Sequence, residues 1–315
     1  MAKPRILFMG TPAFALPTLE LLSSTNYPVI GVVTQPDRPA GRGQKEIASP
    51  AKLLAQSLGL PVFQPQKVRD QSFLDIFYQL KPEMVVVAAF GQILPKSIIE
   101  FPKLGCLNIH PSLLPKYRGA APLNWSIIRG ETKTGVTIML MDEGMDSGDI
   151  LLQQETPLGT TETYGQLHDR LAKEGANLLM TAIQQVIAGN ALRRPQDSSG
   201  VTFAPRLTKE TGRIDWQQSC TDIVNLIRGL CPTPAAYSFL EGQALKIFTA
   251  EPKSGKPKET PGTIGADTSQ SLSVAADDGY VIIKEVQLAG KKRLPINEFL
   301  RGYRLQPETI LRQRV

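Results

Sequence analysis

The stretch MVVVAAF at residues 84–90 is apolar from end to end. A short apolar run rich in β-branched residues is typical of a strand buried on both faces, as in a parallel sheet covered by helices. Similar runs occur before and after it, and segments with helical spacing of apolar residues separate them. The predicted strands are 5–9, 29–34, 84–90 and 106–110, and the predicted helices are 14–24, 50–58 and 73–80. We therefore predict an α/β fold with a doubly wound, Rossmann-like parallel sheet.

The pattern changes beyond this region. Strands are expected at 136–141 and 150–154, followed by a long helix at 163–188. Residues 190–207 are rich in polar residues, proline and arginine, and we interpret them as a linker between a domain at 1–189 and a domain at 208–315. The second domain is predicted to be a smaller, mostly antiparallel β-barrel, with a helix at 220–230, strands at 244–250, 262–264, 271–276 and 280–288, and a tight turn at Asp278-Gly279.

The composition is that of a globular chain with two domains, with 315 residues of which 42% are hydrophobic. Three cysteines without a CxxC pair indicate a reducing compartment and no structural zinc. No apolar run reaches the roughly 18 residues of a membrane span, and the first residues lack the apolar core of a signal peptide, so a cytoplasmic protein is expected. The net charge of +6, of which residues 201–315 carry +4, favours polyanionic partners such as nucleic acid without identifying one.

The histidine that ends the 106–110 strand is the first candidate for chemistry. His110 would lie at the carboxyl end of a parallel strand, where the ligand sites of open α/β sheets gather. Asn108 lies two residues earlier, so both side chains leave the strand on the same face. A purely structural histidine is the alternative at this point. The second histidine, His168, is expected to be a packing or surface residue of the long helix.

Two turn-rich segments could complete a site around this pair. PSLLPKYRG at 111–119 is a long loop stiffened by proline, in which Leu113 and Leu114 are expected to be exposed, as in a binding loop. MDEGMDSGD at 141–149 holds four acidic residues and two glycines, and glycines let a backbone approach a ligand closely. The acidic segment is either a solvated turn or the source of one carboxylate that hydrogen-bonds the histidine.

An asparagine, a histidine and a carboxylate together suit acyl transfer without a covalent intermediate. Amide and imidazolium N–H groups stabilise a developing oxyanion, and a carboxylate or a water accepts the proton of an attacking amine. A serine or cysteine nucleophile fits less well, because there is no GxSxG motif and Cys106 lies inside a predicted strand. Two distant histidines predict no metal site, and the single glycine of GTPAF at 10–14 argues against a dinucleotide fingerprint.

Three motifs, in this order along the chain, resemble the 10-formyltetrahydrofolate-dependent formyltransferase family. They are NIH at 108–110, SLLP at 112–115 and GMDSG at 144–148. MGTPAFALPTLE at 9–20, TQPDRPAGRG at 34–43 and TKETGRIDW at 208–216 extend the resemblance past the predicted linker. The resemblance implies a transferase that moves formyl from 10-formyltetrahydrofolate to the α-amine of methionyl-initiator tRNA, giving N-formylmethionyl-tRNA for translation initiation.

The same resemblance implies roles for individual residues. Asn108 and His110 would stabilise the oxyanion that forms when the amine attacks the formyl carbon. Asp146 would set the state of His110 and assist proton movement. The folate pterin would lie in a pocket of backbone and apolar groups formed by Phe90, Gly91, Gln92, Ile93, Leu94, Met139 and Asp142, on which Ser112, Leu113, Leu114 and Pro115 close.

A basic loop provides the expected contact with RNA. Residues 36–47 are rich in glycine and proline and carry Arg38, Arg42 and Lys45, and in the family the matching loop contacts the tRNA acceptor arm. Arginine pairs with phosphate and stacks on unpaired bases. A mobile surface loop is the alternative. The basic run Lys291, Lys292 and Arg293 is a second candidate contact, in a domain that the resemblance describes as an OB-like, tRNA-binding barrel.

Two other functions remain open from the residues. The same site could act on another acceptor, such as an amino-sugar nucleotide, glycinamide ribonucleotide or water, or the chain could be a non-catalytic RNA-binding protein. The basic loop at 38–45 favours tRNA, because a small acceptor does not need it. The expected partners are therefore initiator methionyl-tRNA and the folate co-substrate, with no metal, no membrane and a monomeric chain.

Overall fold

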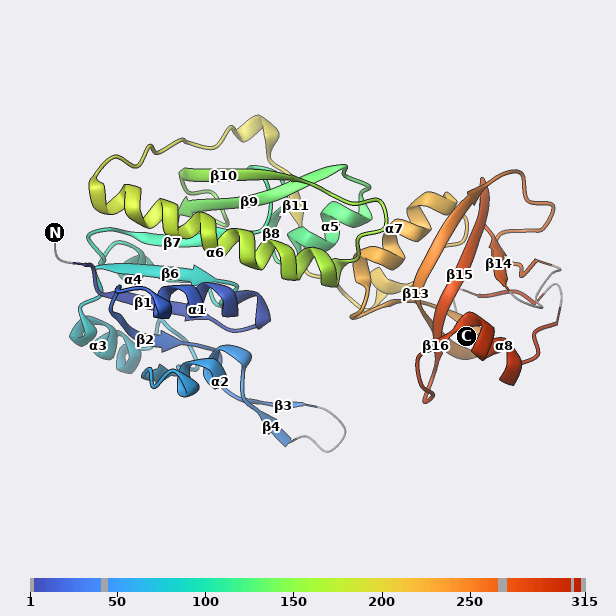
Figure 1. Ribbon diagram of the computed structural model, residues 1–315, viewed down its shortest axis with the longest axis horizontal. Helices are drawn as coiled ribbons and strands as arrows, with labels where there is room; N and C mark the ends of the chain where they lie inside the picture. The colour runs from blue at the N-terminus through green and yellow to red at the C-terminus, as the bar shows by residue number, and fades with distance from the viewer. Residues whose placement is uncertain (1–2, 41–44, 266–270, 307–308, 313–315) are drawn as a thin grey trace. The chain divides into compact units, whose positions relative to one another are not determined.

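The computed structural model describes residues 3–40, 45–265, 271–306 and 309–312 (Figure 1). The chain forms two compact units that interleave along the sequence. The first consists of Met1–Gly119, Thr134–Pro157 and His168–Phe203, and the second of Ala120–Lys133, Leu158–Leu167 and Ala204–Val315. The division into a catalytic domain at 1–189, a linker at 190–207 and a tRNA-binding domain at 208–315 stays a prediction.

A seven-stranded sheet in the order β10-β9-β7-β6-β1-β2-β5 forms the first unit (Figure 1). Its strands are β1 (Ile6–Gly10), β2 (Val29–Val33), β5 (Val62–Phe63), β6 (Met84–Ala88), β7 (Cys106–His110), β9 (Lys133–Leu140) and β10 (Ile150–Pro157). The pairs from β5 through β2, β1 and β6 to β7 are all parallel, which confirms the predicted parallel sheet. β9 departs from this pattern, because it runs antiparallel to β7.

Helices cover both faces of this sheet, which explains why β1, β2 and β6 are apolar throughout. They are η1 (Ala13–Ala15), α1 (Leu16–Ser24), α2 (Pro50–Ser57), α3 (Gln71–Leu80), α4 (Lys96–Ile99) and α6 (Tyr164–Ala188). On one face, Phe77 of α3 and Ile98 of α4 share an apolar cluster with Cys106 of β7. On the other face, α6 lies so close to β7 that a Cβ at Gly175 would be 2.8 Å from Ile109. Successive residues of β7 therefore face different helices.

The winding of the sheet reverses beside β1. The chain adds β2 and β5 on one side of β1 and then returns to the other side for β6 and β7. In open α/β sheets, ligands bind outside the carboxyl ends of the strands near such a reversal. The carboxyl end of β6 leads into residues 90–94, and β7 ends at His110, so both predicted segments follow strands on this side of the reversal.

The second unit is built on an antiparallel sheet of five strands. They are β12 (Ala236–Leu240), β13 (Gln243–Ser254), β14 (Leu272–Ala275), β15 (Gly279–Leu288) and β16 (Leu294–Pro295), in the order β12-β13-β15-β14 with β16 on β15. Isolated bridges Phe239↔Arg312, Thr263↔Ile310 and Ile264↔Val274 join β12 to β14 through two further segments, so the backbone pairing closes into a ring. The predicted strand at 262–264 forms only these bridges.

Of the remaining elements, only α7 (Cys220–Leu230) was predicted, and it has the predicted bounds. The sequence did not reveal the others, which are β3 (Arg38–Ala40), β4 (Lys45–Ile47), β8 (Arg118–Gly119), α5 (Pro122–Ile128), η2 (Ser198–Gly200), β11 (Phe203–Ala204), η3 (Glu210–Gly212) and α8 (Ile296–Gly302). β12 and α5 were missed because each buries a polar residue on its inner face. Ser238 accepts from the Trp216 indole, and Asn124 donates to the carbonyl of Gly229.

Within the described ranges, no helix is both long and apolar enough to cross a membrane.

Candidate active site

Asn108 and His110 lie on one face of β7, as the spacing predicted. They are nearly buried, with 9% and 4% of their surfaces exposed. Across the strand pair, Asn108 is opposite Met139 and His110 is opposite Thr137. In the described part of the chain, the Asn108 amide has no hydrogen-bond partner. The amide of this residue, which is 9% exposed, is therefore available to hydrogen-bond a ligand.

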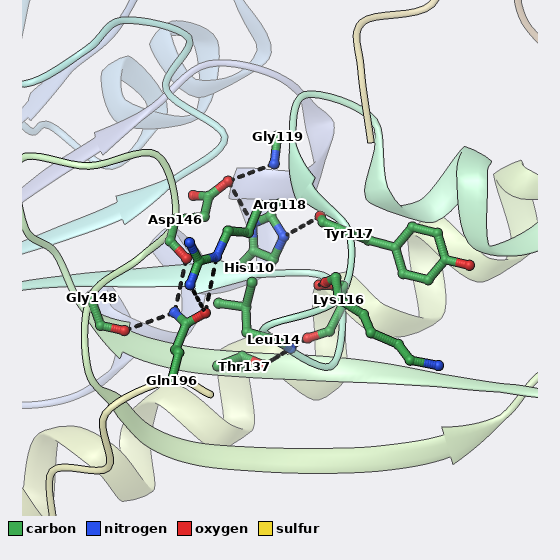
Figure 2. A network of polar contacts seen from close by, with 11 residues as sticks. His110, Leu114, Lys116, Tyr117, Arg118, Gly119, Thr137, Asp146, Gly148 and Gln196 are labelled. Carbon is green, nitrogen blue, oxygen red and sulfur yellow. Dashed lines mark hydrogen bonds and ion pairs between the residues drawn. The ribbon is translucent and has the colours of Figure 1, made fainter. Parts of the chain in front are cut away.

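The two ring nitrogens of His110 have different surroundings (Figure 2). Nε2 lies 3.0 Å from the carbonyl oxygen of Tyr117. A carbonyl only accepts, so Nε2 must carry a hydrogen and donate it. Nδ1 lies 3.6 Å from Oδ2 of Asp146, which is within ion-pair range but too long for a hydrogen bond. The exchangeable position of the ring is therefore Nδ1, and it faces a carboxylate.

Asp146 reaches His110 from the turn between β9 and β10. Its φ of 51° lies in the left-handed region, and its Oδ2 accepts a hydrogen bond of 2.8 Å from the backbone N–H of Gly119. Two other acids of the turn face elsewhere: Asp142 accepts from Ser147 and the N–H of Gly144, and Glu143 pairs with Lys96 at 3.0 Å. The structure thus brings Asp146 and His110 together.

The two glycines of this turn are required by its own packing. A Cβ at Gly148 would lie 1.7 Å from the carbonyl oxygen of Leu140, and a Cβ at Gly144 would lie 2.0 Å from Oγ of Ser147. A side chain at Gly148 would force the backbone of the turn open, since real Cβ atoms do not approach that closely, whereas a side chain at Gly144 would make the Ser147 hydroxyl turn away from Asp142. The glycines therefore allow the close folding that carries Asp146 back to β7.

The loop at 111–119 is held down by strands β9 and β10. Thr137 Oγ1 donates to the carbonyl of Ser112 at 2.7 Å and accepts from the N–H of Leu114 at 3.2 Å. Gln153 Nε2 donates to the carbonyl of Leu114 at 2.7 Å. The expected exposure of Leu114 is wrong, because its side chain is 3% exposed and packs with Met139 and Ile150.

The predicted folate segment at 90–94 follows β6. Phe90 and Leu94 are buried, whereas Ile93 is 91% exposed. The side chain of Gln92 bonds Val68 and Pro65 and so fixes the segment. In the described chain, the peptide groups of residues 91–94 make no hydrogen bond, which leaves a strip of backbone donors and acceptors for a ligand. A flat heterocycle with donors and acceptors on one edge fits such a strip.

The side chains that catalysis by a serine or cysteine nucleophile would need are hydrogen-bonded to other groups. Burial raises the pKa of the Cys106 thiol to about 12, and its Sγ points to the carbonyls of Ile98 and Ile99. Ser112 is fully buried and donates its hydroxyl to the carbonyl of Lys116 at 2.7 Å. His110 Nε2 is bonded to Tyr117, so it does not pair with either group. The geometry therefore favours non-covalent over nucleophilic catalysis.

Cys106 is expected to resist alkylation by iodoacetamide at pH 8 in the folded protein. With a pKa of about 12, roughly one thiol in 10,000 is ionised at that pH, and only the thiolate reacts. Mass spectrometry of digested protein after a timed reaction measures this. The same reaction in denaturant is the control and should modify Cys106 fully. Rapid modification of Cys106 in the native protein would contradict the buried, protonated thiol.

Sequence reasoning missed the residues that hold the pair in place. The missed residues are Tyr117, Arg118, Gly119, Thr137, Gln153 and Gln196. The first three lie in the loop that was singled out, directly after its proline-rich start. Gln196 carries no local signal, because it lies in the polar segment that was predicted as a linker.

The basic loop is only partly described. Arg38 lies on β3, which pairs antiparallel with β4, and it is exposed. At the base of this loop, Lys52 and Gln64 donate hydrogen bonds to the Asp37 carboxylate. These bonds, of which that of Lys52 has the larger effect, hold the pKa of Asp37 below its ordinary value. Arg42 lies outside the described residues, and of Lys45 only the backbone is described.

The second basic run and the second histidine have clear surroundings. Arg293 pairs with Glu285 and lies over the ring of Phe248 at 4.1 Å, whereas Lys291 and Lys292 are exposed. His168 packs edge-on against Phe14, with ring centroids 5.5 Å apart, which confirms its packing role. No group of three or more histidine, cysteine or acidic residues that could hold a metal occurs among the described residues.

Known proteins match this chain along nearly its whole length. Residues 4–183 match the family described as "Formyl transferase", and residues 206–304 match "Formyl transferase, C-terminal domain". The chain is 53% identical to the methionyl-tRNA formyltransferase of Syntrophus aciditrophicus (strain SB), over 99% of this chain and 100% of that protein. It is 46% identical to the methionyl-tRNA formyltransferase of Alkaliphilus oremlandii (strain OhILAs), over 98% of this chain and 99% of that protein.

Solved structures share the fold at lower identity. WlaRD, a sugar 3N-formyl transferase crystallised with dTDP and 5-N-formyl-THF, superposes with a TM-score of 0.67 at 19% identity, over 93% of this chain and all of that one. HypX from Aquifex aeolicus, in complex with tetrahydrofolic acid, gives a TM-score of 0.63 at 20% identity over 95% of this chain, which spans 47% of HypX. With both family domains matched and relatives about half identical from end to end, the chain belongs to the formyl transferase family.

Proposed function

We propose that this chain transfers the formyl group of 10-formyltetrahydrofolate to the α-amine of methionyl-initiator tRNA. The observation that carries the proposal is its similarity to relatives named methionyl-tRNA formyltransferase, at 46–53% identity over 98–99% of the chain. Identity at this level extends through both family domains, so the second domain is retained together with the first. The product is N-formylmethionyl-tRNA.

His110 stabilises the charge that develops on the formyl oxygen. Because the carbonyl of Tyr117 holds Nε2–H, only Nδ1 is available to donate to a substrate oxygen. Nδ1 donates only when the ring is an imidazolium, since Nε2 already carries the other hydrogen. The Asp146 carboxylate lies 3.6 Å from Nδ1 and attracts the imidazolium directly when it forms. Asn108, two residues earlier on the same face, adds a neutral amide donor.

Asp146 also accepts the proton that the attacking amine loses. Its Oδ2 is already bonded to Gly119 N–H and faces His110, which leaves Oδ1 for the amine or for an intervening water. The free peptide groups of 91–94 and the loop at 112–115 hold the folate beside the pair. The assigned pterin contacts are Phe90, Gly91, Gln92, Ile93, Leu94, Met139, Asp142, Ser112, Leu113, Leu114 and Pro115.

A parallel acceptor assay tests the proposal. The purified chain is incubated with 10-formyltetrahydrofolate and methionyl-initiator tRNA, with an amino-sugar nucleotide, with glycinamide ribonucleotide, or with no acceptor. Formyl-methionine released from tRNA by mild base should appear only in the first reaction. Formylation of a small amine with none of methionyl-tRNA, or folate deformylation without any acceptor, would refute the proposed acceptor.

Arg42→Ala should weaken the use of tRNA and reduce the salt dependence of kcat/KM for methionyl-tRNA by about one unit of log–log slope. We assign Arg38, Arg42 and Lys45 to phosphate contacts with the acceptor arm, and one lost contact releases one fewer counterion. Initial rates at several salt concentrations measure the slope, and folate affinity should not change. Arg69→Ala, which removes an exposed arginine outside this loop, is the matched control. An equal slope in Arg42→Ala and wild type would rule out the contact.

A further inference from the structure

The side chain of Gln196 lies between the two segments that hold the histidine–carboxylate pair (Figure 2). Its Nε2 donates to the carbonyl oxygens of Asp146 and Gly148, both at 2.8 Å. Its Oε1 accepts from Nε and Nη2 of Arg118, at 3.1 and 2.7 Å. A glutamine amide has two donor hydrogens and two oxygen lone pairs, so all of its capacity is used.

The first of these segments is the turn that carries Asp146. At a φ of 51° the backbone of this residue is in the left-handed region, which persists in a non-glycine residue only where the surroundings enforce it. Gln196 bonds the carbonyl of Asp146 itself and that of Gly148, two residues later. One side chain therefore holds the peptide group that follows Asp146 and another peptide group two residues later, and so supports the backbone from which the Asp146 carboxylate projects.

The second segment is the end of the loop at 117–119. The carbonyl of Tyr117 accepts from His110 Nε2, and the N–H of Gly119 donates to Asp146 Oδ2. Arg118 lies between these two residues, and its guanidinium bonds Gln196. Tyr117, which anchors His110, and Gly119, which anchors Asp146, are thus the chain neighbours of Arg118. Arg118 is the residue that Gln196 holds. Gln196 therefore bridges the two segments around the pair, in which Nδ1 and Oδ2 are 3.6 Å apart.

The backbone around Gln196 is itself anchored on both sides. Two residues before it, Arg194 exchanges backbone hydrogen bonds of 2.9 and 2.8 Å with Ile150. Six residues after it, the carbonyl of Thr202 accepts from the N–H of Arg118. A side chain on such a supported backbone can position its neighbours to within the tolerance that catalysis requires.

We propose that Gln196 is a positioning residue for formyl transfer, which acts through Asp146 and does not touch the substrate. This role rests on the proposed function of the same site. Gln196 holds the Asp146 turn against Arg118 and thereby keeps the carboxylate facing Nδ1 of His110. The segment that the sequence presents as a linker accordingly supplies part of the catalytic geometry.

Gln196→Leu, which removes all four hydrogen bonds and leaves a shorter apolar side chain, is expected to lower kcat about 10- to 100-fold, because small displacements of reacting groups cost that much. The KM values for folate and methionyl-tRNA should change less than about threefold, since Gln196 binds neither. Gln71→Leu is the matched control: Gln71 lies on α3 and bonds Asp75 of the same helix, so kcat should not change.

A double-mutant cycle with Asp146→Asn separates positioning from general destabilisation. If Gln196 acts through the carboxylate, Gln196→Leu should lower kcat by less than about threefold in the Asp146→Asn background. Equal factors in both backgrounds, or an unchanged kcat in the single variant, would overturn the proposal. Should thermal unfolding show that Gln196→Leu is not folded, Gln196→Glu serves in the same cycle, since it keeps the acceptor for Arg118 and loses both donors. Wild-type protein that does not formylate methionyl-tRNA refutes the proposed function instead.

Discussion

Replacing Asp146 with asparagine is expected to lower kcat for formyl transfer about 1,000- to 10,000-fold. The asparagine oxygen can still accept from the N–H of Gly119, so the turn should keep its place. What is lost is the negative charge 3.6 Å from Nδ1 of His110, and with it both the stabilisation of the imidazolium and the proton acceptor for the amine. Single-turnover transfer from 10-formyltetrahydrofolate to methionyl-tRNA measures the chemical step directly.

Glu143→Gln is the matched control for this substitution. It removes a carboxylate from the same turn, but one that pairs with Lys96 and is exposed. Its rate should stay within about threefold of wild type, because exposed ion pairs contribute little. Folate and tRNA binding should survive in both variants. A rate in Asp146→Asn within tenfold of wild type, or equal losses in the two variants, would mean that the charge of Asp146 has no special role.

His110→Ala is expected to reduce kcat at least about 1,000-fold, since loss of one oxyanion donor alone removes a factor of 100 to 1,000. The loss should exceed that of a single donor, because the Asp146 carboxylate then faces no cation. Binding of methionyl-tRNA, measured by filter retention or anisotropy, should be unchanged. Parallel loss of binding and rate would instead indicate a structural role for His110, the alternative that the sequence left open.

The other histidine of the chain provides the control. His168 packs edge-on against Phe14, and its Nδ1 lies 2.9 Å from Oδ1 of Asp169. His168→Ala should lower the melting temperature slightly and leave the formyl transfer rate within about threefold of wild type. The contrast between the two alanine variants separates the chemistry of His110 from the general cost of removing a partly buried ring.

The fold was predictable where burial alone sets the residue type. β6 is apolar throughout because helices cover both faces of the sheet, and the predicted strand at 106–110 has the bounds of β7. Prediction failed where a buried polar residue satisfies a tertiary hydrogen bond. Ser238 interrupts the apolar pattern of β12, and Asn124 that of α5, and both are paired with groups distant in sequence. Local periodicity carries no information about such partners.

The site divides in the same way. The placement of Asn108 and His110 on one face required only the two-residue repeat of a strand. The choice of Asp146 among four acids came from resemblance to a family, because composition treats all of them alike. The structure supplies the physical distinction: Asp142 is turned toward Ser147, Glu143 toward Lys96, and Asp146 toward His110.

The sequence by itself determined the parallel sheet, the strand that ends in His110 and the pair of side chains on its face, because a strand's repeat and its burial are local properties. The tertiary structure alone decided that Nε2 is held by Tyr117, that Nδ1 faces Asp146, and that Gln196 links the two segments around them. These contacts join residues from 7 to 78 positions apart. Hydrogen bonds over such separations depend on how the chain folds back on itself, which no local pattern encodes.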